Sequence, residues 1–356
     1  MMELKPLVIG DLKAKTPVIQ GGMGVGVSLS NLAGAVALHG GIGIISTAQI
    51  GYKDPTFDQN PLEANLRAIT THIKKAKEIA KGGIVGVNIM VATKKYEEYV
   101  KTAAKAGADL IISGAGLPTM LPKLVEGFQT KIAPIVSSVK SAHVICKIWD
   151  RKYQKAPDLV VVEGPRAGGH LGFTIGQLEN VTKEWFDEEF QGIVQVVKEF
   201  AQKYQRPIPV IAAGGIYNRA DIEHYLNLGA DGVQMGTRFV TTYECDADLR
   251  YKMAYIHAKK EDIVLVQSPV GMPGRAISNA FMEGVKIEKP KISLCHQCLE
   301  HCNPATIPYC ITDALIHAAK GEVDRGLLFC GDNAYRAEKL EHVEDIMKEL
   351  SEESIL

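Results

Sequence analysis

The sequence lacks an excess of charge of either sign, and it lacks long apolar runs. Its 40 basic residues are balanced by 41 acidic ones, so the formal net charge is -1 at pH 7. This balance gives no indication of a nucleic-acid or membrane partner. A run of about 18 uncharged apolar residues, which a membrane-spanning helix needs, is missing. The first residues, Met-Met-Glu-Leu-Lys-Pro, contain no apolar signal core, so we expect a cytoplasmic protein.

Short fixed-period repeats and low-complexity segments are also missing. What remains is a chain of 356 residues with 46% hydrophobic and 23% charged residues, a composition typical of a globular enzyme. This length suits one large α/β barrel with an appendage. Seven cysteines in a reducing compartment indicate thiols or metal ligands rather than disulfides.

Short apolar runs alternate with amphipathic segments, which is typical of β/α units. The runs show no alternation of polar and apolar residues, as expected for parallel strands covered on both faces. The predicted strands are Pro17–Gln20, Gly43–Ser46, Val85–Met90, Leu110–Ser113, Ala133–Ser137, Leu159–Val162, Val210–Ala213 and Gly232–Met235. The predicted helices between them include Leu62–Lys81, Lys94–Ala106, Ile193–Tyr204 and Ala220–Leu228.

Eight such units indicate an α/β protein with a (β/α)8 TIM barrel, since the alternative doubly wound sheet rarely needs eight similar units. We divide the chain into a barrel over residues 1–240, helices that pack on it as a lid over residues 241–290, and an appendage over residues 291–356. The appendage is helical and holds five of the seven cysteines. It ends in a charged helix predicted from about Arg336 to Glu349.

The most informative segment runs from Glu163 to Gly172 and reads Glu-Gly-Pro-Arg-Ala-Gly-Gly-His-Leu-Gly. It follows a predicted strand, and its glycines let the backbone approach a flat or phosphorylated ligand closely. His170 would hold an imidazole over that ligand, and an unperturbed imidazole titrates near neutral pH. Arg166 in the same segment is either an anion-binding residue or a solvated loop arginine.

Glycines also follow the last two predicted strands, where such barrels commonly bind phosphate through backbone N–H groups. Gly214 and Gly215 lie after one strand, and Gly236 and Thr237 lie after the next. Any one glycine pair could simply turn the chain. Because ligands of these barrels bind where the strands end, the set as a whole predicts a site for a phosphorylated cofactor.

Five motifs in order resemble the nitronate monooxygenase family, formerly called 2-nitropropane dioxygenases. The related flavin-dependent enoyl-acyl-carrier-protein reductases share nearly the same set. The motifs are Gln20-Gly-Gly-Met23, Gly86-Val-Asn-Ile-Met90, the segment Glu163–Gly172, Pro209-Val-Ile-Ala-Ala-Gly-Gly-Ile216 and Gln234-Met-Gly-Thr-Arg-Phe239. The match covers about residues 10–280, including the later Gly274–Asn279. Residues 173–207 are longer than their counterpart in the enoyl reductases, so contacts made there do not transfer.

The resemblance implies one FMN in the barrel and a catalytic histidine at His170. The phosphate would lie at Gly214, Gly215, Gly236 and Thr237. The full set of implied cofactor-binding residues is Gly21, Gly22, Met23, Asn88, Glu163, Gly168, Gly214, Gly215, Gln234, Gly236 and Thr237.

The activity that the resemblance implies is oxidation of small alkyl nitronates with O2. His170 would hydrogen-bond the substrate anion or exchange a proton with it. One alternative is an NAD(P)H-dependent reductase that acts on an enoyl thioester, another activated alkene or a quinone. An alternative from another class is a non-catalytic barrel that binds a phosphorylated ligand.

Four clustered cysteines form the second strong pattern: Cys295-x2-Cys298-x3-Cys302-x7-Cys310. Such spacing predicts either a [4Fe–4S] cluster or a zinc ion, and a run of packed thiols is the third interpretation. The opening is similar to the cluster-binding run of dienoyl-CoA-reductase-type enzymes. Related nitronate-monooxygenase-like chains carry a similar tail, whereas compact enoyl reductases lack it. If the tail binds no metal, we expect it to be a lid or an oligomer contact. A homodimer is therefore one possible assembly.

Overall fold

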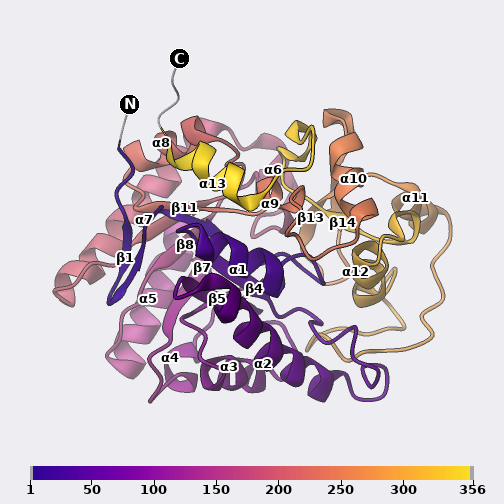
Figure 1. Ribbon diagram of the computed structural model, residues 1–356, viewed down its shortest axis with the longest axis horizontal. Helices are drawn as coiled ribbons and strands as arrows, with labels where there is room; N and C mark the ends of the chain where they lie inside the picture. Colours follow the sequence, from indigo (N-terminus) through magenta and orange to yellow (C-terminus); the bar gives the residue numbers. More distant parts are fainter. Residues whose placement is uncertain (1–2, 353–356) are drawn as a thin grey trace.

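The protein folds around a closed barrel of eight parallel strands, in the order β10-β11-β3-β4-β5-β6-β7-β8 (Figure 1). The computed structural model describes residues 3–352. The barrel strands are β3 (Val18–Gln20), β4 (Ile42–Ser46), β5 (Ile84–Met90), β6 (Leu110–Gly114), β7 (Lys131–Val136), β8 (Val160–Glu163), β10 (Val210–Ala213) and β11 (Gly232–Met235). They are the eight strands that the sequence predicts, with ends that differ by at most two residues. The predicted (β/α)8 barrel is confirmed.

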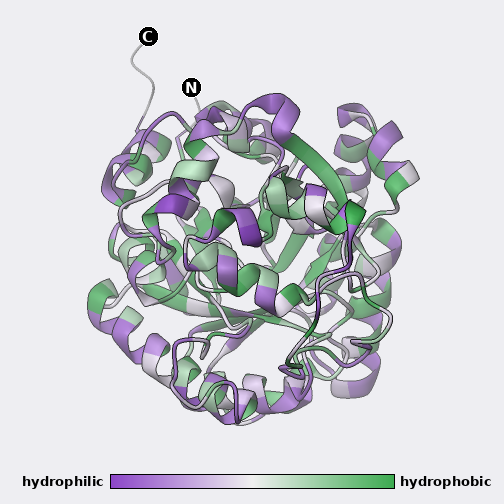
Figure 2. Ribbon diagram, turned by 90° about the vertical axis from the view of Figure 1, so that its right-hand side faces the viewer, coloured by the Kyte–Doolittle hydropathy of each residue, from purple (hydrophilic) through white to green (hydrophobic). Residues whose placement is uncertain are grey.

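The barrel strands are apolar on both faces because both faces are buried. Every residue of β4 is buried. Its Ile42 and Ile44 point into the barrel interior, whereas Ile45 belongs to the core between strands and helices. Figure 2 shows the hydrophobic residues concentrated on the strands and the hydrophilic ones on the outer helices. This arrangement explains why the strands read as continuous apolar runs.

A β-hairpin that the sequence analysis missed closes one end of the barrel. Strands β1 (Leu7–Ile9) and β2 (Leu12–Ala14) pair antiparallel. Leu7 and Ile9 are buried in the barrel's interior cluster. Asp11 at the turn forms an ion pair with Lys131, the first residue of β7. The hairpin therefore covers the amino-terminal ends of the strands and leaves the carboxyl-terminal ends for a ligand.

Helices surround the barrel, and those that the sequence predicts within the barrel are confirmed, with one extension. Predicted helix 193–204 is the second half of a longer helix, whose start Thr182 caps by accepting a hydrogen bond from the Trp185 N–H at 3.2 Å. The barrel helices are α1 (Ser30–Leu38), α2 (Pro61–Ala80), α3 (Tyr96–Lys105), α4 (Leu121–Leu124), α5 (Val139–Tyr153), α6 (Ile175–Asn180), α7 (Lys183–Lys203), α8 (Arg219–Asn227) and α9 (Thr237–Val240). Among residues 3–352, none of the helices could span a membrane.

Beyond the barrel, a small sheet and several helices cover its carboxyl-terminal rim. Strands β12, β13 and β14 form this sheet, and the short strand β9, from the loop after β8, joins it by pairing with β13. The remaining elements are β9 (Gly169–His170), α10 (Leu249–His257), η1 (Lys260–Asp262), β12 (Ile263–Gln267), β13 (Pro273–Ile277), α11 (Ala280–Ile287), α12 (Ile311–Ala319), η2 (Val323–Arg325), β14 (Leu328–Phe329), η3 (Ala334–Arg336) and α13 (Val343–Ser351).

The packing joins segments 241–290 and 291–356, which the sequence analysis separates. Val266 and Met282 share one small apolar core with Tyr309 and Leu327. The end of the chain then returns to the barrel, where α13 packs against α1 and α8 (Figure 1). The three-part division stays an interpretation of the sequence.

The charged helix was predicted to begin at about Arg336, and this start is wrong. Residues 334–336 form a 3-10 turn, and α13 begins only at Val343. The backbone of Glu341 is engaged elsewhere, because its N–H donates to Thr241 O at 3.1 Å and its carbonyl accepts from Tyr243 N at 3.0 Å. A residue paired this way cannot also make the i to i−4 bonds of a helix.

We predict that the tail helix stabilises the whole barrel. Ile346 of α13 is fully buried in the main core, so Ile346→Ala should lower the free energy of unfolding by about 2–5 kcal/mol. The exposed Lys348, on the same helix, provides the matched control Lys348→Ala. Chemical unfolding of both variants measures the effect. Equal stabilities would show that α13 is not part of the barrel core.

Candidate functional site

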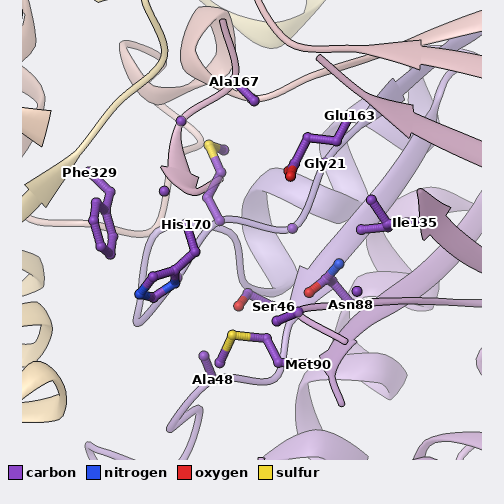
Figure 3. A pocket seen from close by; sticks show the side chains of 18 of the residues that line it. Gly21, Ser46, Ala48, Asn88, Met90, Ile135, Glu163, Ala167, His170 and Phe329 are labelled. Atoms are coloured by element: carbon purple, nitrogen blue, oxygen red, sulfur yellow. The ribbon is translucent and has the colours of Figure 1, made fainter. Parts of the chain in front are cut away.

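A cavity of about 510 Å³ opens at the carboxyl-terminal rim of the barrel. Every catalytic and cofactor-binding residue that the sequence analysis names lines it, as does Cys298 of the cysteine segment. Figure 3 shows His170 and Phe329 on one side of the cavity, with Glu163 and Asn88 on the other. The parallel barrel explains this, because all its strands end at the same rim.

Three strand ends contact one another closely at the floor of the cavity. A Cβ atom added at Gly22 would lie 2.4 Å from Cβ of Asn88, and one added at Gly21 would lie 2.9 Å from Cγ of Gln234. Glycine is therefore required at both positions, because side chains from β5 and β11 occupy the space beside them. Gln234 Oε1 is buried and has no hydrogen-bond partner. A ligand with an N–H donor, such as a flavin ring, fits this unpaired acceptor.

The turn after β10 contains two successive glycines in the left-handed region of backbone conformation. Gly214 and Gly215 have φ values of +98° and +77°, a region that favours glycine. In a turn of this sort, successive backbone N–H groups can form an anion-binding concavity. With Gly236 and Thr237 lining the same cavity, the loop fits the phosphate of a nucleotide cofactor.

His170 is held by the small sheet rather than by a free loop. It lies in β9, opposite Gly274 of β13. Its Nε2 is 2.7 Å from Oγ of Ser268, and its ring meets the ring of Phe329 edge-on at 5.0 Å between centroids. Burial lowers the pKa of His170 to about 4, so the imidazole is neutral at pH 7. The sequence-based expectation of an imidazole titrating near neutral pH is therefore wrong for this environment.

The group that titrates near pH 7 is instead Glu163 at the end of β8. Burial disfavours its charged form and raises its pKa to about 7, although a hydrogen bond from the Gly172 backbone opposes this. The cavity thus contains a neutral histidine and a carboxyl group that is partly protonated at neutral pH. Such shifted groups are common where proton positions matter for a reaction.

The sequence analysis missed residues that reach the cavity from distant segments. Ser268, buried at the start of the loop before β13, is the partner of His170. Phe329 and Asn333 come from the tail, and both line the cavity. Ser268 lies six residues before Gly274–Asn279, a segment that also resembles the family but does not include this serine. The sequence leaves the role of Arg166 open, as an anion-binding or a solvated residue. In the structure its Nε lies 2.7 Å from Oδ2 of Asp332, and the two side chains form an ion pair.

The four cysteines of the tail are not arranged as a ligand set. Within residues 3–352, no group of three or more histidine, cysteine or acidic side chains is placed to hold a metal ion. Cys295 is exposed, and the other three are partly buried. Burial and the neighbouring thiols Cys302 and Cys295 raise the pKa of Cys298. The metal site stays a prediction, and binding would require these thiols to move together and lose their protons.

The comparisons with known proteins agree with this geometry. A family profile described as nitronate monooxygenase matches residues 5–353. The chain belongs to the nitronate monooxygenase family. This confirms the resemblance read from the five motifs, and it makes the protein an oxidoreductase of a flavin-dependent family that acts on small-molecule substrates.

Individual relatives are similar at moderate identity. A probable nitronate monooxygenase of Staphylococcus saprophyticus is 28% identical over 304 residues, which cover 79% of this chain and 81% of that protein. FabK from Thermotoga maritima has a TM-score of 0.72 at 25% identity, covering 95% of this chain and 92% of that one. A nitroalkane oxidase of Streptomyces ansochromogenes has a TM-score of 0.70 at 18% identity, covering 95% of each chain, and at that identity it shows the fold alone.

The metal prediction can be tested directly. If the cysteines bind metal, anaerobically purified protein should contain stoichiometric iron or zinc, and Cys298→Ser should release it, since thiolates are the ligands. Cys146, buried in the barrel core, gives the control Cys146→Ser. Elemental analysis and the visible spectrum measure the content. Wild-type protein without metal would leave packed thiols as the account of this segment.

Proposed function

We propose that the chain binds one FMN at the barrel rim and uses it to oxidise alkyl nitronates with O2. The observation that carries this proposal is the cavity itself, which combines a glycine turn suited to phosphate, an unpaired buried acceptor and a neutral histidine. Bound flavin would supply the electron transfer that no side chain of the cavity can perform. The residues of the chain would bind, orient and shield the reactants.

The state of His170 favours a nitronate over a neutral nitroalkane as substrate. A histidine with a pKa of about 4 is a weak base, so it is poorly suited to removing a proton from carbon. A nitronate is already deprotonated and needs only a hydrogen-bond donor to hold its oxygen. A neutral imidazole has one N–H for this purpose. If the Ser268 hydroxyl donates to Nε2, that N–H lies at Nδ1.

A second candidate function, reduction of an activated alkene or quinone with NAD(P)H, rests on Glu163. Reducing an enoyl thioester requires a proton donor at the carbon next to the carbonyl. The Glu163 carboxyl, with a pKa of about 7, is half protonated at neutral pH and could supply that proton. FabK of Thermotoga maritima, similar in fold, keeps this alternative relevant.

The two functions are separated by parallel assays of flavin-loaded protein. Oxygen uptake with propionate-3-nitronate tests the first, and NADH oxidation with a crotonyl thioester or a quinone tests the second. Oxygen uptake without NADH would support nitronate oxidation. If the protein instead oxidises NADH with the alkene or quinone and takes up no oxygen with the nitronate, the reductase function replaces nitronate oxidation. Purified protein without flavin, and unable to take up added FMN, would overturn both and leave a barrel that binds another phosphorylated ligand.

We predict that His170→Ala retains flavin but lowers turnover with nitronate by about 10²- to 10³-fold, the range for loss of one hydrogen-bond donor to a reacting anion. Ser268→Ala is the comparison, because it removes the partner of the imidazole and leaves the ring in place. Its effect should be smaller. Steady-state oxygen uptake and flavin absorbance measure the two properties. Undiminished turnover in His170→Ala would remove the assigned role, and loss of flavin would make His170 a cofactor-positioning residue.

A second prediction concerns pH. Glu163 is neutral below its pKa of about 7 and negative above it, so it repels an anionic substrate at higher pH. We expect kcat/KM for a nitronate to fall as pH rises through about 7, and Glu163→Gln to remove this decline. The ionisation of the substrate is the same in both proteins and cancels in their ratio. A decline that persists unchanged in Glu163→Gln would assign it to another group.

A further inference from the structure

A short part of the tail, residues 330–333, crosses the barrel rim at the two glycine-containing turns after β10 and β11. We call it the rim segment; it reads Cys-Gly-Asp-Asn. It follows β14 directly and is far in sequence from both turns. Its Cys330, Gly331 and Asn333 line the cavity. The cavity is therefore bounded here by the tail as well as by the barrel.

Asn333 fixes the backbone of the first turn. Its side chain is buried, with 5% of the residue exposed. Its Nδ2 donates to the carbonyl of Gly215 at 2.6 Å. Glycines with positive φ have wide conformational freedom, so a bond to this carbonyl restricts the turn. In a planar trans peptide the N–H of Ile216 points opposite to the Gly215 carbonyl, so the same bond also orients that amide.

Gly331 orients the hydroxyl of the second turn. Its backbone N–H donates to Oγ1 of Thr237 at 2.9 Å. A threonine hydroxyl that accepts this bond keeps its own proton for another acceptor. A Cβ atom at position 331 would lie 2.7 Å from that oxygen, so only glycine allows this approach without a shift. Thr237 is thus prepared to donate a hydrogen bond within the cavity.

The rim segment also positions a cation at the same place. Arg166 lines the cavity, and its Nε donates to Asp332 Oδ2 at 2.7 Å. Its Nη2 donates to Oδ1 of Asn333 at 3.3 Å. Asn333 therefore contacts both the turn at Gly215 and the guanidinium. Backbone amides, a hydroxyl donor and a guanidinium are the groups that proteins use for phosphate.

We propose that the rim segment completes the phosphate subsite of the cofactor and that Asn333 is its central positioning residue. The inference rests on the proposed binding of FMN and adds to it a role for the tail. Tail and barrel then contribute jointly to one subsite. A change in the tail should consequently weaken binding of the phosphate without touching the ring site at Asn88 and Gln234.

The experiment compares FMN with riboflavin, which has the same ring and no phosphate. Dissociation constants of both are measured by fluorescence titration of flavin-free protein. We expect Asn333→Ala to raise the constant for FMN about tenfold or more, as for loss of a buried hydrogen bond near a charged group, and to leave riboflavin nearly unchanged. Asn333→Asp should show the same selectivity, because it removes the donor to Gly215 and adds a negative charge.

The matched control is Asn279→Ala. Asn279 also donates from Nδ2 to backbone carbonyls of the tail, at 2.6 Å to Val323 and 2.8 Å to Gly326, but it lies outside the cavity. It should lower the melting temperature without changing the ratio of the two constants. Equal loss of FMN affinity in both variants would reduce the effect to tail destabilisation and overturn the inference.

The remaining outcomes separate this inference from the function on which it rests. Gly236→Asp places a carboxylate beside the proposed phosphate in a backbone conformation, φ −114°, that any residue tolerates. If it abolishes selective FMN binding while Asn333→Ala leaves it intact, the phosphate site stands and the role of the rim segment is wrong. If wild-type protein binds neither flavin, or binds both equally, the proposed cofactor site fails together with the inference.

Discussion

Closure of a parallel barrel is the constraint on which the rest of this structure depends. Eight parallel strands place all of their carboxyl ends at one rim, so residues more than 200 positions apart in sequence, such as Gly21 and Gln234, become neighbours. The hairpin at Leu7–Ala14 strengthens this asymmetry by closing the opposite end. In the part of the barrel that the structure describes, the cavity therefore opens at one rim only, and the small sheet of β9, β12, β13 and β14 covers that side.

The sequence predicted the features that depend on local signals. Continuous apolar runs gave all eight strands, because burial on both faces leaves no polar positions within them. Glycines at the strand ends gave the residues that line the cavity. The hairpin was missed because each of its strands has three residues, too short for a reliable pattern. Strand β9 was missed because it has only two residues, and these form a strand by pairing with β13, about a hundred positions later in the chain.

The pKa values of the groups in the cavity could not be predicted from the sequence, for a related reason. A histidine in a glycine-rich segment suggested a group titrating near neutral pH, but a pKa depends on enclosure, and distant residues create it. Phe329 and Ser268 surround the His170 ring, and burial favours its neutral form. The same enclosure acts in the opposite direction on Glu163, since it is the charged form of each group that burial disfavours. Ordinary pKa values predict a histidine that titrates near neutral pH and a carboxyl group that is fully charged there. In this cavity the histidine is neutral at pH 7 and the carboxyl group is the one that titrates.

The tail connects stability with the site. Its last helix is part of the main core, and Arg238, which follows Thr237 in sequence, pairs with Glu341 and Glu349 of the tail. The rim segment makes a hydrogen bond to each of the two glycine-containing turns. Because a ligand that binds only the folded state stabilises it, any cofactor held jointly by barrel and tail must also favour the docked tail. Binding at the rim and attachment of the tail are then thermodynamically linked, although the residues responsible lie about a hundred positions apart in the chain.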